Sequence, residues 1–402
     1  MQAAGMIIEY NPLHSGHVYL MEETRRRLGA DTPIIGVMSG DFVQRGDFAL
    51  LRRQARARAA VESGADLVLE LPLPWAVSSA ERFADGGVQT LLATGLVAHL
   101  TFGSECGDAT ALREVAECLL SEACQTELRS RLGGGKSYAA CRQSAVEALL
   151  GKEKASLLET PNNNLGVEYC KALLRHGDRV QPVTTKRLGA AHDAQAKAGE
   201  HPSASVIRGM LQQGERSAAL ELMTPAMRMQ YLAEEAAGRA PVFPENCERA
   251  VLARLRAMSR AEFEALDEGQ EGVGRRLYDA CREAASLREV LDAAKTKRYA
   301  YARLRRMALW AYLGLTPADC PAAPLYLRPL AANAVGRELL AKMRKSAAVP
   351  VLTKPNHVRK LSPAAQELFA MEARAADMYA LAYPELSASA GGKLWKESPE
   401  ML

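Results

Sequence analysis

The first hundred residues alternate short apolar runs with stretches of helical periodicity, and this alternation constrains the fold more than any other feature. The apolar runs cover residues 5–9, 33–38, 66–71 and 100–102, and the helical stretches cover 17–28, 50–63 and 78–94. Such alternation is typical of parallel strands joined by crossover helices, because a parallel pair needs a long connection. The sequence therefore predicts an α/β fold with a Rossmann-like, doubly wound parallel sheet.

The remaining chain is predicted to be mostly helical. Residues 109–160 form a helical insertion, a further strand covers 179–187, and a helix starts at 202–205. Beyond about residue 224 the strand signal disappears. We therefore predict a first domain over 1–223 and a second, all-helical domain over 224–402.

The bulk composition is that of an ordinary globular protein rich in helix. The 402 residues are 48% hydrophobic and 24% charged. A chain of this length and hydrophobic content can form a large core. No run of about 18 apolar residues occurs, and no basic segment followed by an apolar one opens the chain, so neither a membrane span nor a secretory signal is predicted. The eight cysteines form no C-x-x-C pair, as is typical of reduced thiols. Together these features predict a cytoplasmic protein.

An H-x-G-H sequence, His14-Ser15-Gly16-His17, lies between the first predicted strand and the first predicted helix. A helix that begins near His17 directs free N–H groups and a positive dipole end beyond the strand, which favours a phosphate. Gly16 would let a nucleotide pack against the backbone. The two imidazoles can donate hydrogen bonds to phosphate oxygens that gain charge while the α-phosphorus is attacked. This junction favours nucleotidyl transfer; the alternatives are two surface histidines or half of a zinc site.

A polar loop follows the second predicted strand and should face the same crevice, because ligands bind beyond the carboxyl ends of parallel strands. Its candidate substrate-binding residues are Ser39, Gly40, Gln44 and Arg45. The glycine allows a tight path, and Gln44 and Arg45 offer donors suited to a carboxylate or a phosphate. A plain exposed loop explains the segment equally well.

A second anion site is predicted where Ser203, Ser205 and Arg208 form an S-x-S-x-x-R arrangement at a helix start. Hydroxyls, free N–H groups and a guanidinium would converge there on the β- and γ-phosphates of a nucleotide. Ordinary helix capping is the alternative.

Further nucleotide contacts are predicted at other strand and helix ends. Gly103, after a strand, would let an adenine approach the backbone. Asn162 or Asn163 and Arg187 are candidates for purine, ribose or phosphate contacts, and each is equally compatible with a capping or surface role.

The segment 295–306 is the densest basic stretch and contains no acidic residue, although the net charge of the whole chain is only +4. On a helix it would present a broad cationic face for RNA phosphates, with tyrosine available for stacking on a base. A solvated helix face is the alternative. The RNA-binding residues we expect are Lys295, Lys297, Arg298, Tyr301, Arg305 and Arg306.

Seven segments, taken in order, resemble the bacterial tRNA(Met) cytidine acetate ligase family, a branch of the H-x-G-H nucleotidyltransferases. They are GMIIEYNPLHSGH, VMSGDFVQRG, DLVLELP, TFGSE, PNNNLGVEYCKAL, SASVIR and KRYAYARLRR. They span residues 1 to about 315, with weaker similarity to Lys354, so the resemblance is far more specific than any single motif.

The resemblance implies a sheet of the nucleotidyltransferase type and a two-step reaction. Acetate would attack the α-phosphate of ATP, and the acetyl group would pass to the wobble cytidine of elongator tRNA(Met), giving N(4)-acetylcytidine. His14 and His17 would stabilise charge at the α-phosphate. Mg²⁺ would bind together with the ATP, and the sequence identifies no protein ligand for it. The ATP-binding residues that the resemblance implies are Ile7, Ile8, Glu9, Tyr10, Asn11, Pro12, Leu13, His14, Ser15, Gly16, His17, Val18, Tyr19, Leu20, Gly103, Asn162 and Arg187.

Two other functions stay open from the sequence. The first is an adenylyltransferase acting on a small cofactor precursor, which would not need the basic helical half. The second is a non-catalytic RNA-binding protein with a vestigial nucleotide site, which intact His14, Gly16 and His17 disfavour. The oligomeric state is not predicted.

Overall fold

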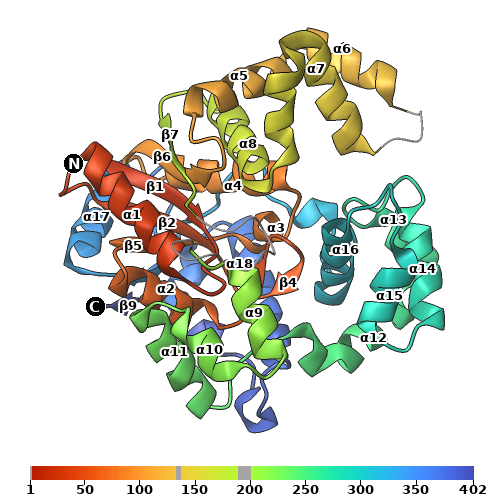
Figure 1. The fold of residues 1–402 in the computed structure, drawn as a ribbon. Helices are drawn as coiled ribbons and strands as arrows, with labels where there is room; N and C mark the ends of the chain where they lie inside the picture. The colour runs from red at the N-terminus through yellow and green to blue at the C-terminus, as the bar shows by residue number, and fades with distance from the viewer. Residues whose placement is uncertain (1, 133–136, 189–200) are drawn as a thin grey trace.

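A computed structural model describes residues 2–132, 137–188 and 201–402, and its centre is a seven-stranded sheet (Figure 1). In order across the sheet the strands are β7 Gln181–Lys186, β6 Val97–Ser104, β1 Ala3–Ile8, β2 Ile34–Ser39, β5 Leu67–Leu71, β8 Pro329–Ala332 and β9 Glu400–Met401. The first five strands are parallel, whereas β8 runs antiparallel to β5. The predicted α/β class with a mainly parallel sheet is confirmed.

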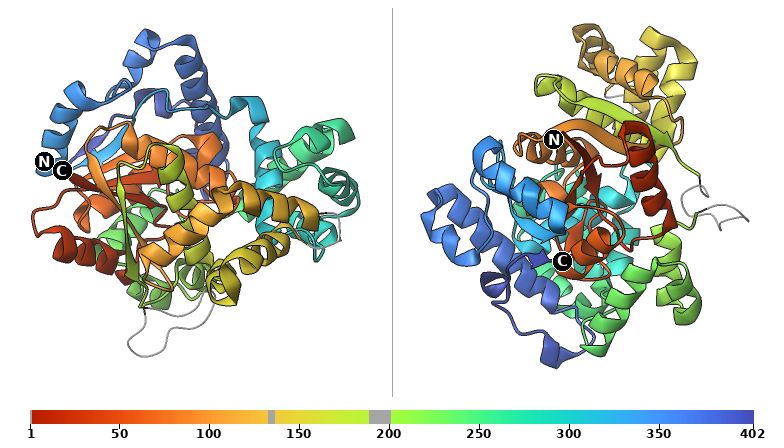
Figure 2. Two further views of the ribbon diagram at one scale, coloured as in Figure 1. Left: turned by 90° about the horizontal axis from the view of Figure 1, so that it is seen from above. Right: turned by 90° about the vertical axis from the view of Figure 1, so that its left-hand side faces the viewer.

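Helices connect the strands of the first half and make up most of the second half. In the first half they are α1 Ser15–Leu28, α2 Arg53–Glu62, α3 Leu73–Ala76, α4 Ala80–Leu92, α5 Ala109–Leu120, α6 Glu122–Arg131, α7 Tyr138–Ser156, α8 Pro161–Arg175, α9 Ala204–Gln212, α10 Arg216–Glu221 and α11 Pro225–Ala236. In the second half they are α12 Glu248–Ala257, α13 Arg260–Ala265, α14 Val273–Glu283, α15 Leu287–Ala294, α16 Tyr301–Leu313, α17 Ala334–Ser346 and α18 Pro363–Ala380. Helices α12 to α15 gather beside the sheet rather than on it (Figure 2). None of the helices in the described ranges is long and apolar enough to cross a bilayer.

The parallel strands are apolar along their whole length because helices cover both faces of the sheet. Side chains alternate between the faces along each strand. In β2, Ile35 and Val37 pack with α4, α5 and α8, whereas Ile34 and Met38 pack on the other face with α1, α2 and α11. The carboxyl ends of β1, β2, β6 and β7 are therefore the edge of a rigid layer, on which a site can be held in place.

The C-terminal half is mostly helical, as predicted, but two short strands in it belong to the sheet. Strand β8 pairs with β5, and β9 pairs with β8. The expectation that strands end before residue 224 is therefore wrong at 329–332 and at 400–401. Strand β8 reads Pro-Leu-Ala-Ala and β9 has only two residues, so neither shows the alternating or β-branched pattern that identifies a strand. The domain boundary at 224 stays a prediction, with the sheet taking strands from both sides of it.

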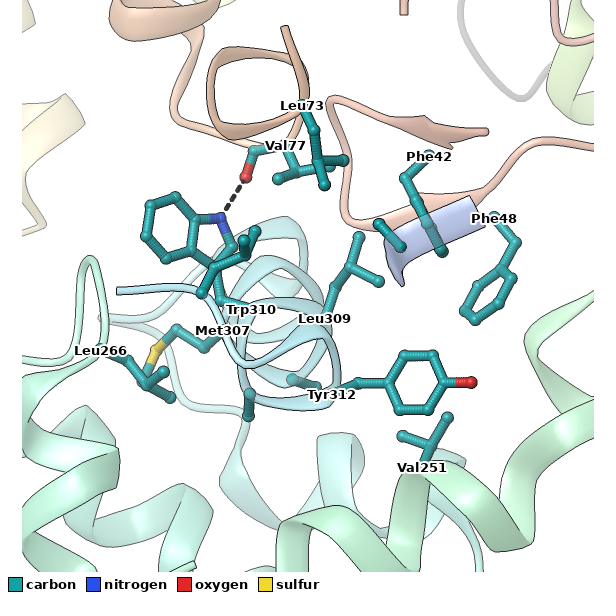
Figure 3. Packing of buried hydrophobic residues seen from close by; sticks show 14 of the residues in the cluster. Phe42, Phe48, Leu73, Val77, Val251, Leu266, Met307, Leu309, Trp310 and Tyr312 are labelled. Atoms are coloured by element: carbon teal, nitrogen blue, oxygen red, sulfur yellow. Dashed lines mark hydrogen bonds between the residues drawn. The ribbon is translucent and has the colours of Figure 1, made fainter. Parts of the chain in front are cut away.

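A separate hydrophobic core joins the sheet half to helix α16 (Figure 3). It includes Phe42 and Phe48 from a small antiparallel ribbon, β3 Phe42–Val43 and β4 Asp47–Phe48. The ring of Phe48 lies 5.9 Å from that of Tyr312, centroid to centroid. Trp310 Nε1 donates a 2.8 Å hydrogen bond to the Val77 carbonyl. The ribbon after β2 is thus held directly against α16.

The turn of this ribbon touches the backbone of α16 at Gly46. Gly46 has φ +74°, and a Cβ there would lie 2.3 Å from the Arg306 nitrogen. Only glycine tolerates both the left-handed conformation and the close approach. The predicted substrate loop and the predicted RNA-binding helix are consequently neighbours.

Candidate active site

The two histidines of the H-x-G-H sequence cap helix α1. The helix begins at Ser15, two residues before the expected start, and His14 is its N-cap. His14 Nδ1 accepts a 3.1 Å hydrogen bond from the Gly16 N–H, and His17 Nδ1 accepts a 3.2 Å hydrogen bond from the His14 N–H. This reciprocal capping box fixes both rings, whose centroids lie 3.9 Å apart.

The capping bonds determine which imidazole atom can donate. Because each Nδ1 accepts a hydrogen bond, each neutral ring carries its proton on Nε2. Burial, reinforced by Arg187 nearby, lowers the pKa of His14 to about 3. Burial and the neighbouring His14 lower the pKa of His17 well below its ordinary value. At neutral pH each ring is therefore uncharged and offers one fixed Nε2–H donor.

The backbone at this junction differs from the prediction in two ways. The Gly16 N–H, expected to be free for a phosphate, is occupied by His14. A Cβ on Gly16 would lie 3.1 Å from the His14 ring and 3.2 Å from the His201 side chain. Glycine is thus required by the packing of two imidazoles, and the imidazoles, more than the helix amides, supply donors.

Candidates from three distant segments meet in one pocket at the carboxyl end of the sheet. Its lining includes His14, Gly16, His17, Leu20, Gly103 and Arg187. Gly103 is near the end of β6 and Arg187 follows β7, and a Cβ on Gly103 would lie 3.2 Å from the Arg187 side chain. The Arg187 guanidinium makes no hydrogen bond or ion pair with another described residue, so it is available to an anion. We call this space the histidine pocket.

Sequence reasoning missed a third histidine in the histidine pocket, His201. Its Nδ1 lies 2.8 Å from the Ser15 hydroxyl, and its ring lies 5.6 Å from that of Tyr19. A lone histidine 184 positions from the H-x-G-H sequence carries no local signal, because only the fold brings the two together. Ser15 and Val18 line a surface groove next to it.

Several residues of the segment implied to bind ATP are structural. Ile8, Tyr10 and Leu13 are buried in the core beneath α1 and α2, and Ile7 packs against the opposite core. Pro12 is also buried. These five side chains shape the loop that carries the histidines and do not face the histidine pocket.

Asn162 holds the loop after β6 instead of lining the pocket. Its side chain donates a 2.7 Å hydrogen bond to Glu105, and the N–H of Asn163 donates a 2.7 Å hydrogen bond to the other oxygen of that carboxylate. Helix α8 starts at Pro161, so the asparagines lie in its first turn and do not form its N-cap. The Glu105 carboxylate accepts hydrogen bonds from the backbone N–H groups at the start of α8, where the helix dipole also favours a negative charge. Asn162 therefore positions Gly103 indirectly.

A larger cavity of about 600 Å³ lies beside the loop 9–13, and we call it the inter-domain cavity. The sheet half contributes Glu9, Asn11, Arg45, Asp47, Ser205 and Arg208 to its lining. The helical half contributes Glu245, Glu248, Leu291, Tyr301, Arg305 and Tyr312.

The S-x-S-x-x-R arrangement starts a helix, as predicted, with Ser203 as the N-cap of α9. Ser205 and Arg208 line the inter-domain cavity and not the histidine pocket. Arg208 donates a 2.5 Å hydrogen bond to the Asn11 carbonyl, so it also supports the loop that carries the histidines. Its role as a grip for the β- and γ-phosphates stays a prediction.

The predicted substrate loop has only one free donor. The Gln44 amide donates to the Ser78 carbonyl at 3.0 Å and so turns away from the crevice. Ser39 donates to Glu9 at 3.3 Å, and a Cβ on Gly40 would lie 2.7 Å from Glu70. Arg45 lines the inter-domain cavity without a hydrogen bond or ion pair to a described residue.

The predicted cationic helix face is smaller than expected. Helix α16 begins at Tyr301, so Lys295, Lys297 and Arg298 lie in the irregular segment before it. Arg298 lies 3.6 Å from Glu271. Arg305 stays half-exposed, with its guanidinium 4.9 Å from the Tyr301 ring centre.

Arg306 is a correction to the predicted RNA-binding set. It is 8% exposed, and its guanidinium makes two hydrogen bonds, of 2.7 and 2.8 Å, with the Glu268 carboxylate. The acid comes from the segment between α13 and α14, far outside the acid-free basic stretch. Arg306 therefore joins α16 to the segment between α13 and α14 and carries no free charge for RNA.

The sequence profile described as HIGH Nucleotidyl Transferase matches residues 1–393. A tRNA(Met) cytidine acetate ligase of Acetivibrio thermocellus is 34% identical over 397 residues, with 95% of each chain covered. That of Syntrophotalea carbinolica is 35% identical over 422 residues, covering 99% of this chain and 98% of the relative.

Solved structures agree with these relatives. The crystal structure of Thermotoga maritima TmcAL in its apo form superposes with a TM-score of 0.95 at 31% identity, covering 100% of both chains. The same protein bound with alpha-thio ATP gives a TM-score of 0.94 over 100% of both chains. The chain belongs to the tRNA(Met) cytidine acetate ligase family of HIGH nucleotidyl transferases.

Proposed function

We propose that this protein activates acetate with ATP as acetyl-adenylate and transfers the acetyl group to the wobble cytidine of elongator tRNA(Met). The observation that carries the proposal is the reciprocal cap of His14 and His17, which fixes two uncharged Nε2–H donors beside Arg187 and Gly103. The names and coverage of the relatives agree with it.

In the first step an acetate oxygen attacks the α-phosphorus of ATP and pyrophosphate leaves. Negative charge then grows on the non-bridging oxygens of the α-phosphate. Donors that are already fixed stabilise this charge without reorganising, which is the main source of rate enhancement in such sites. His14 and His17 can provide these donors, and Arg187 can provide a positive charge.

Magnesium would be bound chiefly by the triphosphate. Within the described ranges no three His, Cys, Asp or Glu side chains lie close enough together to hold a metal ion. Mg²⁺ commonly retains several waters and relies on substrate phosphates for its remaining ligands. When bound, it would neutralise part of the charge on the departing pyrophosphate.

In the second step the N4 amine of the cytidine attacks the acetyl carbonyl carbon, and AMP leaves with its bridging oxygen. Free acetate is a poor acyl donor, whereas AMP is a stable leaving group. The RNA would approach from the side of α16, where Tyr301 and Arg305 lie at the inter-domain cavity. Lys295 and Lys297 are exposed beside it and could contact phosphates.

The test is to incubate the purified protein with ATP, acetate and unmodified elongator tRNA(Met), and to analyse the digested tRNA by mass spectrometry. We expect N(4)-acetylcytidine at the wobble position only when all three substrates are present. A reaction without acetate and one with a tRNA whose wobble base is uridine serve as controls. Absence of the modified base, together with absence of acetate-dependent exchange of pyrophosphate into ATP, would refute the proposal.

A further inference from the structure

The two cavities lie on opposite sides of one loop because β1 lies inside the sheet, with a strand on each side. Strand β6 pairs with one edge of β1, and β2 pairs with the other. The histidine pocket takes Gly103 from β6 and Arg187 from the position after β7. The inter-domain cavity takes Arg45 and Asp47 from the loop after β2. The strand order reverses at β1, because the chain adds β2 on one side of it and β6 on the other. Ligands of open α/β sheets bind at such a reversal point.

The inter-domain cavity has the size and chemistry for a nucleotide. Its volume of about 600 Å³ is within the range typical of small-molecule sites. Arg45 and Arg305 line it, and guanidinium groups bind phosphates; Arg305 also lies 3.9 Å from the Asp47 carboxylate. Tyr301 lines it as well, and an aromatic ring is the usual stacking partner for a base that has left its own stack.

Glu9 lines the inter-domain cavity. It is the first residue after β1 and is half-buried. One oxygen, Oε1, accepts hydrogen bonds from the Gln44 N–H at 2.7 Å and from the Ser39 hydroxyl at 3.3 Å. The other oxygen, Oε2, has no hydrogen bond or ion pair with any residue in the described ranges. The side chain is therefore held by one oxygen and leaves the second available to a ligand.

We propose that the inter-domain cavity receives the acceptor cytosine, everted from the RNA, and that Glu9 Oε2 binds its N4 amine. This inference rests on the proposed function and assigns a place to its second step. A carboxylate accepts a hydrogen bond from N4 of cytosine, whereas uracil presents an acceptor oxygen at the same position. Glu9 would thus select the reactive base and orient its amine toward the loop that carries His14.

The transfer step balances with Glu9 as the proton acceptor. The N4 lone pair forms a bond to the acetyl carbonyl carbon, and the bond from that carbon to the bridging oxygen breaks. AMP leaves with the electron pair. The proton lost from N4 passes to Glu9 Oε2 and then to water. The products are N(4)-acetylcytidine, AMP and one proton.

The substitution Glu9→Gln separates this role from adenylation. The amide oxygen can still accept from Gln44 and Ser39, so the loop stays anchored, but an NH₂ group replaces Oε2. We expect acetyl transfer from preformed enzyme-bound adenylate to slow by about 100-fold or more. We expect acetate-dependent pyrophosphate exchange to stay within about threefold of the wild type, since that step does not use Oε2. Glu338→Gln, the same change at an exposed position of α17 outside both cavities, should leave both rates unchanged.

A second pair of variants tests the cavity without altering Glu9. Gly209 lines the cavity from α9, and a Cβ there would meet no atom within 4 Å. Gly209→Trp should place a ring of base size in the cavity and abolish transfer while exchange continues. Gly209→Ala should melt like the wild type, because its Cβ would meet no atom of a neighbouring element within 4 Å.

Each outcome distinguishes the cavity assignment from the proposed function. Loss of transfer with exchange retained in Glu9→Gln and in Gly209→Trp supports the assignment. Normal transfer in either variant overturns it. Loss of exchange together with transfer, in a variant that melts like the wild type, also overturns it, because the residue would then act in adenylation. A wild-type protein that shows neither acetate-dependent exchange nor N(4)-acetylcytidine formation would instead overturn the proposed function.

Discussion

At the scale of single residues, the histidines combine a structural role with the catalytic role that we propose for them. Each Nδ1 closes the capping box of α1, and each Nε2 is left to donate. The structure of the helix start therefore sets the tautomer and the orientation of the reactive groups. A substitution at either position changes both the helix and the chemistry, and the two effects can be separated by choosing the replacement.

For His17, we predict that Ala and Asn substitutions differ in stability but not in activity. Both remove the Nε2–H donor, so adenylate formation should fall by at least ~100-fold in each. Asn can still accept from the His14 N–H, whereas Ala cannot, so only His17→Ala should lose about 1 kcal/mol of unfolding free energy. Pyrophosphate exchange and urea denaturation measure the two quantities. Near-full activity in either variant would refute the role of His17.

The lowered pKa of His14 predicts a definite pH dependence of stability. A histidine whose pKa is about 3 when folded and about 6.5 when unfolded binds more protons in the unfolded state between these values. Unfolding free energy should therefore fall as the pH is lowered below 6.5. From pH 7 to pH 5 the loss from His14 should be about 2 kcal/mol.

The variant His14→Asn keeps an acceptor for Gly16 but does not titrate in this range. Its loss of stability between pH 7 and pH 5, measured by denaturant titration, should therefore be smaller than that of the wild type. Equal losses in both proteins, or imidazole nitrogen NMR signals that titrate near pH 6.5, would contradict the assignment of a neutral ring.

At the scale of elements, α16 shows how a basic stretch divides into structural and exposed charges. Consecutive residues on a helix point in directions about 100° apart. Arg306 consequently faces α13 and α14, where it pairs with Glu268, and Arg305 faces the inter-domain cavity. The absence of acidic residues within the stretch gave no indication of this, because the pairing acid lies 38 positions away in sequence.

These neighbours give a matched pair of predictions. Arg306→Ala should lower the unfolding free energy by about 2 kcal/mol, because it leaves Glu268 partly buried without its partner. Arg305→Ala should leave stability within about 0.5 kcal/mol but weaken tRNA binding about fivefold and reduce its salt dependence by about one phosphate contact. Thermal melting and filter binding at several salt concentrations measure these effects. The reverse pattern would place the exposed charge at Arg306.

The elements that could be predicted from sequence are those whose signal is local. Strands β1, β2 and β5, the start of α9 at Ser203 and the helical insertion were predictable from apolar runs, capping residues and periodicity. Strand β8 was not, because four residues carry too little pattern. In the site, the histidines and Gly103 were identifiable, whereas His201 was not, because its position depends on tertiary contacts alone.

At the scale of the whole molecule, the hydrophobic core around α16 fixes the position of the two cavities relative to each other. Tyr312 of α16 packs with Phe48 of the ribbon that follows β2, and Trp310 packs beside Val77 (Figure 3). The same ribbon carries Arg45 to the inter-domain cavity. Helix α16, which we propose to face the RNA, is thereby fixed relative to the loop that carries His14 and His17. An acetyl-adenylate made on one side of this loop would have only the loop's width to cross.

Isotope transfer tests the central claim, attack of acetate on the α-phosphorus, most directly. With acetate labelled by ¹⁸O in both oxygens, one labelled oxygen becomes the bridge of acetyl-adenylate and leaves with AMP after transfer to tRNA. Mass spectrometry should therefore find one ¹⁸O atom in each AMP released and none in pyrophosphate. Unlabelled AMP, or label in pyrophosphate or inorganic phosphate, would contradict the account.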